Sequence, residues 1–278
     1  MATPRAAIQH IACRVGAAIV AAIIATVDPA AAQEPDAAAL AKKLSNPIAD
    51  LISVPIQFNF DQGMGPDGNG ERYLTNIQPV IPFGISEGWN VISRTIVPVI
   101  GLDGVTPAGG SQFGLGDVTQ SLFFSPKVPG PGGLVWGVGP VALIPTATDD
   151  ALGGEQWAAG PTAVALIQRG PWTTGALVNH LWSFAGDDDR ADVNASFFQP
   201  FLAHTWPTAT TLTLNMEMSY DWEDDQAAPV VNVLVSQILP VGSQLIQVGA
   251  GARYWLDGPD GGPEGFGARA QLTFLFPR

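Results

Sequence analysis

Beyond residue 50 the chain is built from about twelve segments of roughly ten residues, each bounded by turn-forming residues. Gly (32 residues) and Pro (24 residues) supply those turns. Segments of this length and spacing predict the strands of an all-β protein. They begin near Leu51, Tyr73, Trp89, Gly114, Leu134, Trp157, Trp172, Ala191, Thr210, Val230, Gln244 and Glu264.

Apolar and polar side chains alternate along these segments, most clearly from Thr210 to Asp221. Because successive side chains of a strand point to opposite faces, one face there carries Leu, Met and Tyr and the other Thr, Asn, Glu and Ser. A soluble β-sandwich or a lipocalin-like barrel also alternates, but here the apolar faces are continuous and the polar faces are too polar for a dry core. The pattern favours a transmembrane antiparallel up-and-down β-barrel with a polar lumen.

The composition agrees with a barrel in a membrane. Charged residues make up 13% of the chain, about half the usual share of a soluble protein. After the N-terminal segment no stretch approaches the ~20 apolar residues of a spanning helix, so the chain would cross a membrane with strands. The net charge of −13 argues against nucleic acid as a partner.

Residues 1–32 have the parts of a secretory signal peptide. Arg5 and Arg14 supply positive charge, Val15–Val27 is an apolar run, and a run of alanines suited to cleavage follows. Cys13, the only cysteine, lies in this segment, so the exported chain would contain no disulfide and no thiolate metal site.

Residues 33–49 form a separate short segment. Asp36 and the Ala-rich stretch after it suit a short helix that ends near Lys42 and Lys43, where the helix dipole favours positive charge. We expect a short helical segment that either lies in the periplasm or plugs the lumen from the periplasmic side, followed by the barrel over residues 50–278.

The connections between the segments are of two alternating kinds. The even ones are mostly short, whereas the odd ones are mostly longer and acidic. Single-chain outer-membrane barrels have an even number of strands, with short periplasmic turns and long outer loops, so both termini are expected in the periplasm. The acidic residues assigned to outer loops are Asp61, Asp67, Glu71, Asp103, Asp149, Asp150, Glu155, Asp187, Asp188, Asp189, Glu223, Asp224, Asp225, Asp257 and Asp260.

A transmembrane barrel allows two further predictions, the residues that line its lumen and the aromatic residues at the membrane surfaces. A charge at the lipid midplane costs ~2–4 kcal/mol for Arg or Lys, so charged and strongly polar residues within the segments should line the lumen. Trp and Tyr near segment ends should form girdles at the two membrane surfaces. The predicted lumen residues are Arg94, Asp117, Glu217, Arg253, Arg269 and Gln271, and the predicted girdles contain Trp89, Trp157, Trp172, Trp182, Trp206, Trp222, Tyr73, Tyr220, Tyr254 and Trp255, with Trp136 as an exception.

A dense acidic run is formed by Asp187, Asp188, Asp189 and Asp192. It carries enough oxygen ligands for a divalent cation, but it lacks the Gly and the terminal Glu of the helix-flanked calcium loop. Two interpretations stay open: a solvated acidic loop, or a Ca²⁺ or Mg²⁺ site that bridges to phosphates of neighbouring lipopolysaccharide. No other cofactor is expected.

The histidines of the exported chain, His180 and His204, bear on whether it is an enzyme. Some outer-membrane barrels are lipases that place His and Ser on one outer face, two residues apart on a strand. Here Ser183 lies three residues from His180 and so points to the opposite face. Ser196 shares a face with His204 but lies eight residues away, too far for a pair along one strand. We expect no catalytic site and assign both histidines to the rims, with a pair across two strands left open.

Several stretches of the exported chain carry a family resemblance. They are residues 46–59 (NPIADLISVPIQFN), 76–82 (NIQPVIP), 114–121 (GLGDVTQS), 137–140 (GVGP), 145–149 (PTATD), 160–162 (GPT) and 253–255 (RYW). In these stretches the sequence resembles the outer-membrane "transporter" proteins named for the meta-pathway of phenol degradation. The resemblance implies an outer-membrane barrel and uptake of a small hydrophobic or aromatic compound, and its motifs mark strands and turns.

The leading hypothesis is a barrel in the bacterial outer membrane that lets a small solute cross passively through a narrow, charged lumen. The alternative is a structural or adhesive barrel without an open pore, whose acidic loops bind cations or a partner. A membrane-embedded lipid hydrolase is the least favoured, because of the His and Ser spacing. The expected partners are outer-membrane lipid and lipopolysaccharide, the barrel-assembly machinery and a small solute of unknown identity.

Overall fold

The computed structural model describes residues 35–106, 109–242 and 244–276. The predicted signal peptide lies outside these residues. In the described part of the chain no helix is long and apolar enough to cross a membrane. The elements are α2 (Pro35–Leu44), β1 (Ile52–Met64), β2 (Gly70–Ile77), β3 (Val80–Gly84), β4 (Trp89–Asp103), β5 (Ser111–Leu115), β6 (Val118–Pro126), the 3-10 turn η1 (Pro131–Gly133), β7 (Leu134–Ile144), β8 (Gln156–Arg169), β9 (Trp172–Gly186), β10 (Asn194–Thr205), β11 (Thr210–Asp221), β12 (Gln226–Val241), β13 (Gln244–Trp255) and β14 (Gly265–Phe276).

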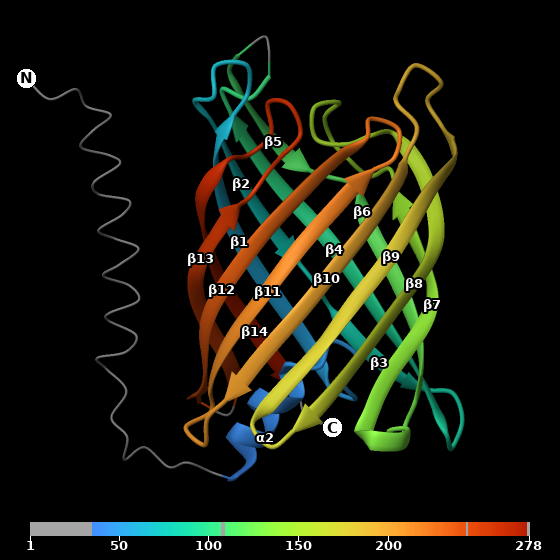
Figure 1. Cartoon of the computed structure of the whole chain (residues 1–278), viewed down its shortest axis with the longest axis vertical. Coiled ribbons are helices and arrows are strands. Elements are labelled where there is room, and N and C mark those ends of the chain that lie inside the picture. The colour runs from blue at the N-terminus through green and yellow to red at the C-terminus, as the bar shows by residue number, and fades with distance from the viewer. Residues whose placement is uncertain (1–34, 107–108, 243, 277–278) are drawn as a thin grey trace, which may run out of the picture. The chain divides into compact units, whose positions relative to one another are not determined.

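The strands form one closed antiparallel barrel, because β14 pairs with β1 over the register from Ile52↔Phe276 to Phe60↔Ala268 (Figure 1). Strands β2 and β3 both pair with β1 and β4, so they are two halves of one wall strand. Strands β5 and β6 likewise follow each other along β4. The fourteen strands of the sheet therefore make twelve strands of the wall. The predicted barrel of about twelve strands, with a short N-terminal helix, is confirmed.

Both broken wall strands have a local cause. Pro79 has no N–H to give to the ladder, while Gln78 next to it still donates to the carbonyl of Pro55 (2.8 Å). The second break lies between β5 and β6. There the connection between β7 and β8 supplies the hydrogen bonds that a neighbouring strand would otherwise supply. The Thr146 hydroxyl accepts the N–H of Val118 and donates to the carbonyl of Gly116 (both 3.0 Å).

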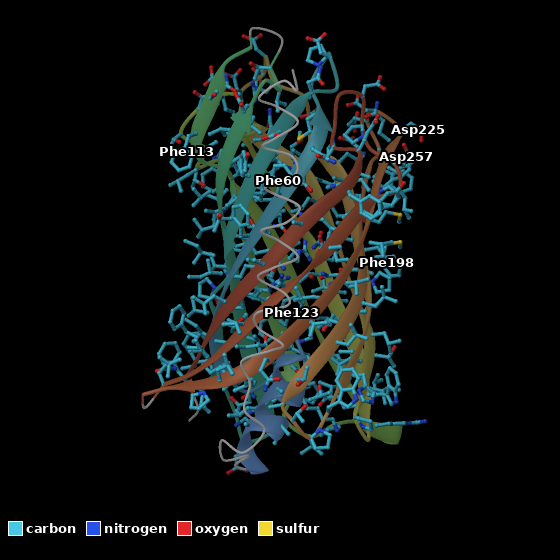
Figure 2. The ribbon with its side chains drawn as sticks, turned by 90° about the vertical axis from the view of Figure 1, so that its left-hand side faces the viewer. Phe60, Phe113, Phe123, Phe198, Asp225 and Asp257 are labelled. Carbon is cyan, nitrogen blue, oxygen red and sulfur yellow. The ribbon has the colours of Figure 1, made fainter. Side chains whose placement is uncertain are left out.

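We call the end of the barrel with the short connections the lower end, and the opposite end the upper end, as drawn in Figure 1. The longer connections lie at the upper end, and Figure 2 shows two of their acidic residues, Asp225 and Asp257, there. The connections are thus sorted as the sequence predicts, with short turns at one end and longer, acidic loops at the other.

Polar side chains fill the inside of the barrel and apolar side chains cover its outside. On β1, Ser53, Asn59 and Asp61 are buried, whereas Phe58 between them is exposed. Phe113 and Phe198 lie at the outer surface in Figure 2. Further exposed apolar residues of the wall strands are Val138, Val178, Leu202, Leu212, Leu214, Val233 and Val235. The alternation read from the sequence therefore separates an inner from an outer face.

One side of the interior is apolar, which the alternation does not predict. Its centre is a buried cluster of Ile48, Val80, Ile92, Phe123, Val164, Leu166 and Leu177. Apart from Ile48, these residues come from β3, β4, β6, β8 and β9, whereas the buried charged residues Asp61, Arg253 and Arg269 lie on β1, β13 and β14. The apolar cluster and the buried charges therefore lie on different sides of the lumen.

A second apolar cluster docks α2 at the lower end of the barrel (Figure 1). Leu40 and Ala41 are buried there together with Leu51, Ile238 and Leu275, which lie in or next to β1, β12 and β14. One polar contact adds to this packing, because the side-chain amide of Gln168 donates to the carbonyl of Lys42 (2.9 Å).

Candidate functional site

Charged side chains from five strands meet on the inner face near the upper end. Glu217 of β11 accepts two hydrogen bonds from Arg269 of β14, at 2.7 and 3.0 Å, and lies 4.0 Å from Arg253 of β13. Asp61 of β1 binds Arg72 of β2 at 2.9 Å and lies 3.3 Å from Arg253. We call these five residues the charge network. Since β12 and β13 separate β11 from β14 in the sheet, the network links distant parts of the wall.

Neutral groups complete this charge network. The amide oxygen of Asn59 accepts a hydrogen bond from Nε of Arg269 (2.7 Å), and Nε1 of Trp255 donates to Asp61 (2.8 Å). The guanidinium of Arg253 lies over the Trp255 ring, 5.3 Å from its centroid. Among the described residues, Nε and Nη1 of Arg253 have no hydrogen-bond partner, so Arg253 is held mainly by charge.

The charge network contains three of the predicted lumen residues, Glu217, Arg253 and Arg269. From the sequence, Asp61 is predicted in an outer loop and Trp255 in a girdle. The structure corrects both assignments, because Asp61 is fully buried and Trp255 binds it from the inner face. Both lie two residues beyond a polar inner-face residue of the same strand, so the alternation itself could have identified them.

A cavity of about 220 Å³ lies inside the barrel below the charge network, and it reaches from Leu44 at the end of α2 to Arg269. Two more predicted lumen residues, Arg94 and Gln271, line it. Arg94 donates to the amide oxygen of Gln78 at 2.8 Å. The other polar lining comes mainly from amides and hydroxyls, and the apolar lining includes Leu51, Val80, Phe201 and Leu234.

The upper end of the lumen is narrowed by the connection between β7 and β8, residues 145–155. Gly114 pairs with Ile100 of β4, and a Cβ on Gly114 would meet the Thr148 hydroxyl and the Leu152 side chain. Leu152 is itself buried. This connection therefore folds against the barrel strands rather than outward, and only glycine leaves room for it.

The remaining predicted lumen residue, Asp117, lies apart from the charge network and holds this connection. Its carboxylate accepts the backbone N–H groups of Thr146 (3.0 Å), Ala147 (3.1 Å) and Gly154 (2.7 Å). A carboxylate that accepts several backbone N–H groups fixes the path of a loop, since hydrogen bonds to charged groups are stronger than neutral ones.

Replacing this carboxylate should loosen the connection. Asp117→Ala removes three charge-assisted hydrogen bonds, so we expect local opening to become easier by about 1.5 kcal/mol or more, roughly a tenfold rise in amide exchange. Hydrogen–deuterium exchange of peptides from residues 145–155 measures this effect. Asp188→Ala, the same change at an exposed aspartate of the neighbouring loop, is the matched control. Unchanged exchange in Asp117→Ala would show that the carboxylate does not hold the loop.

The acidic run after β9 is engaged in contacts within its own loop. Asp187 accepts the backbone N–H of Asp189 (2.8 Å), and Asp192 accepts the hydroxyl of Ser183 (2.9 Å). Among the residues that the structure describes, no group of three or more His, Cys, Asp or Glu side chains is placed to hold a metal ion. A divalent cation at this loop stays a prediction.

The structure brings His180 and Ser196 together across β9 and β10. The two residues are direct cross-strand partners, with 2.8 Å between Nδ1 and Oγ, and Nε1 of Trp222 also donates to Ser196 (2.9 Å). Nε2 of His180 is buried and has no hydrogen-bond partner in the described part of the chain. The arrangement contains the nucleophile and the base of an acyl-transfer site without the third group that usually orients the imidazole.

In sequence, no protein-family model and no curated protein matches the chain. In structure, it is similar to an outer membrane channel from Pseudomonas putida F1, with a TM-score of 0.64 and 12% identity, over 82% of this chain and 96% of that one. The β domain of the Bordetella autotransporter Brka aligns with a TM-score of 0.41 and 12% identity, over 81% of this chain and 99% of that one. The first similarity shows a shared barrel fold, and the second is too low to support an argument.

Proposed function

We propose that the chain is an outer-membrane barrel whose lumen gives a small solute a passive path across the membrane. The observation that carries the proposal is the inverted polarity of the wall. Arg253, Arg269 and Asp61 are buried on the inner face, while Leu and Val side chains are exposed on the outer face. A soluble protein would bury the apolar face, whereas lipid solvates it.

Exposed aromatic side chains at the two ends of the barrel support the membrane placement. Trp89, Trp172 and Trp206 are exposed at the lower end, and Trp182 and Trp222 at the upper end. Such belts occupy the two membrane–water interfaces. Trp136, the exception in the sequence analysis, also belongs to the lower belt, because its ring packs edge-on against Trp89 (centroids 5.8 Å apart).

A through-path requires movement of the parts that narrow the lumen. Helix α2 is docked at the lower end. Residues 145–155 fold inward at the upper end, because they pack on Gly114, whose neighbours Phe113 and Leu115 are exposed on the outer face. The alternative of a structural barrel without an open path predicts that these parts stay in place. The shared fold with an outer membrane channel, and the resemblance to outer-membrane transporter proteins, both favour the channel.

Single-channel recording in planar bilayers tests the proposal. We expect the purified barrel to give small, discrete conductance steps, because the lumen is narrow and polar. A variant without residues 33–46 serves as the second preparation, since it lacks α2. Silent bilayers with both preparations would contradict the channel and leave the structural barrel.

A further inference from the structure

The charge network and the cavity below it carry more positive than negative charge. Their four arginines, Arg72, Arg94, Arg253 and Arg269, stand against two carboxylates, those of Asp61 and Glu217. The whole chain has a net charge of −13, so the sign of the lumen is opposite to that of the protein. The acidic residues lie mainly in the upper connections, away from the cavity.

Arg94 is the arginine of this group without an ion pair of its own, and Glu217, the carboxylate whose charge reaches it, is already bound to Arg269. Each of the other three takes part in an ion pair of the charge network, but none of the ion pairs among the described residues includes Arg94. Its Nη2 donates to the neutral amide of Gln78, and its side chain lines the cavity. A guanidinium withdrawn from bulk water without an anion is unfavourable, so an anion that binds there gains free energy.

We propose that the cavity is a binding site for a small monocarboxylate, with the carboxylate on Arg94 and the apolar body against Phe201 and Val80. Guanidinium groups bind carboxylates with paired hydrogen bonds, and a single arginine without a direct ion pair matches a single negative charge. The volume of about 220 Å³ is smaller than the ~300–1,000 Å³ of pockets for drug-sized ligands, which limits the solute to a compact molecule.

The lining gives this site its expected selectivity. Gln57, Gln78 and Gln271 line the cavity with neutral amides, so the only acceptor among them that binds Arg94 is the uncharged oxygen of Gln78, which a carboxylate can replace. A cation in the cavity would be repelled by Arg94 and Arg269. It would find no free carboxylate to bind, because Glu217 is already bound to Arg269. That the bound carboxylate is also the transported solute rests on the proposed function. The binding itself does not, since it can be measured on a closed barrel.

The test compares an anion with a neutral molecule of the same shape. Sodium benzoate and benzamide are titrated into the full-length barrel, purified in detergent, by isothermal calorimetry. We expect benzoate to bind and benzamide to bind at least about tenfold more weakly, the ratio expected when a charge-assisted contact is lost. Equal binding of both probes, or no binding of benzoate, would overturn the proposal.

Two variants and a control locate the anion. Arg94→Gln removes the charge, and Gln78→Glu keeps Arg94 but gives it an internal carboxylate, so each should weaken benzoate binding by roughly 10–100-fold. Arg169→Gln removes the same charge from an exposed position at the lower end and should bind like the wild type. Heat-shifted migration in gels shows that each variant is folded. Wild-type affinity in both lumen variants would contradict the site.

The outcomes separate this inference from the channel. A barrel that binds benzoate through Arg94 but stays silent in bilayers would retain the site and lose the channel. A barrel that conducts but prefers potassium over chloride in a salt gradient, and does not distinguish benzoate from benzamide, would retain the channel and lose the site.

Discussion

Asp61→Asn is expected to destabilise the barrel by about 3 kcal/mol or more, since breaking a buried ion pair leaves its partners uncompensated. Asp61 is fully buried and is the only carboxylate within 4.0 Å of Arg72 among the described residues. After the substitution Arg253 keeps only its 4.0 Å approach to Glu217. We place the effect at the lower end of the ~3–5 kcal/mol range for buried pairs, because Arg72 reaches solvent.

Equilibrium unfolding in urea, with the barrel in lipid vesicles and followed by tryptophan fluorescence, measures this loss. Asp67→Asn makes the same chemical change in the exposed connection that follows β1, and it should leave the unfolding midpoint unchanged. A midpoint of Asp61→Asn equal to that of Asp67→Asn would mean that the charge network does not stabilise the barrel. Refolding of both variants to heat-shifted bands establishes that the comparison is between folded proteins.

The positions of the strands could be predicted well because turn formers border them. Leu134, Thr210 and Gln244, predicted as segment starts, are the first residues of β7, β11 and β13. The start of β12 was placed at Val230, although the strand begins at Gln226, paired with Asp221. Residues 226–229 show little alternation of apolar and polar side chains. They form part of the strand because they pair with β11.

The interior could be predicted only where it depends on alternation. Because side chains alternate between the two faces of a strand, the sequence places Glu217, Arg253 and Arg269 on the inner face. The alternation does not predict which side chains meet across the lumen. The contact of Glu217 with Arg269 depends on the closure of the barrel, and the contact of Asp117 with Gly154 on the path of a loop. Such long-range contacts leave no periodic signal in the sequence.

The His180 and Ser196 pair shows the same limit. Spacing excludes a His–Ser pair within one strand and leaves a pair across two strands open, and the register of β9 with β10 makes His180 and Ser196 direct neighbours. β9 and β10 are joined by the long connection between Gly186 and Asn194, whose contacts are not visible in a sequence pattern. The lumen and the outer face can therefore be told apart from the sequence, but their contacts cannot.

Leu40→Asp is expected to release α2 from the lower end of the barrel and to open the lumen. Leu40 is 8% exposed and packs in the apolar cluster with Leu51, Ile238 and Leu275. Burial of a leucine contributes about 1.5–3 kcal/mol, and a buried carboxylate adds a further penalty. The ratio of undocked to docked helix should therefore rise about tenfold to a hundredfold. In bilayers this should appear as a higher open probability than in the wild type.

The neighbouring Ala39 provides the matched control, because it lies on the exposed side of the same helix turn. Ala39→Asp adds the same charge without entering the cluster, so its open probability should equal that of the wild type. If α2 plugs the lumen, Leu40→Asp should behave like the variant without residues 33–46. If the two aspartate variants conduct alike, the narrowing at residues 145–155 controls the path and the docked helix does not.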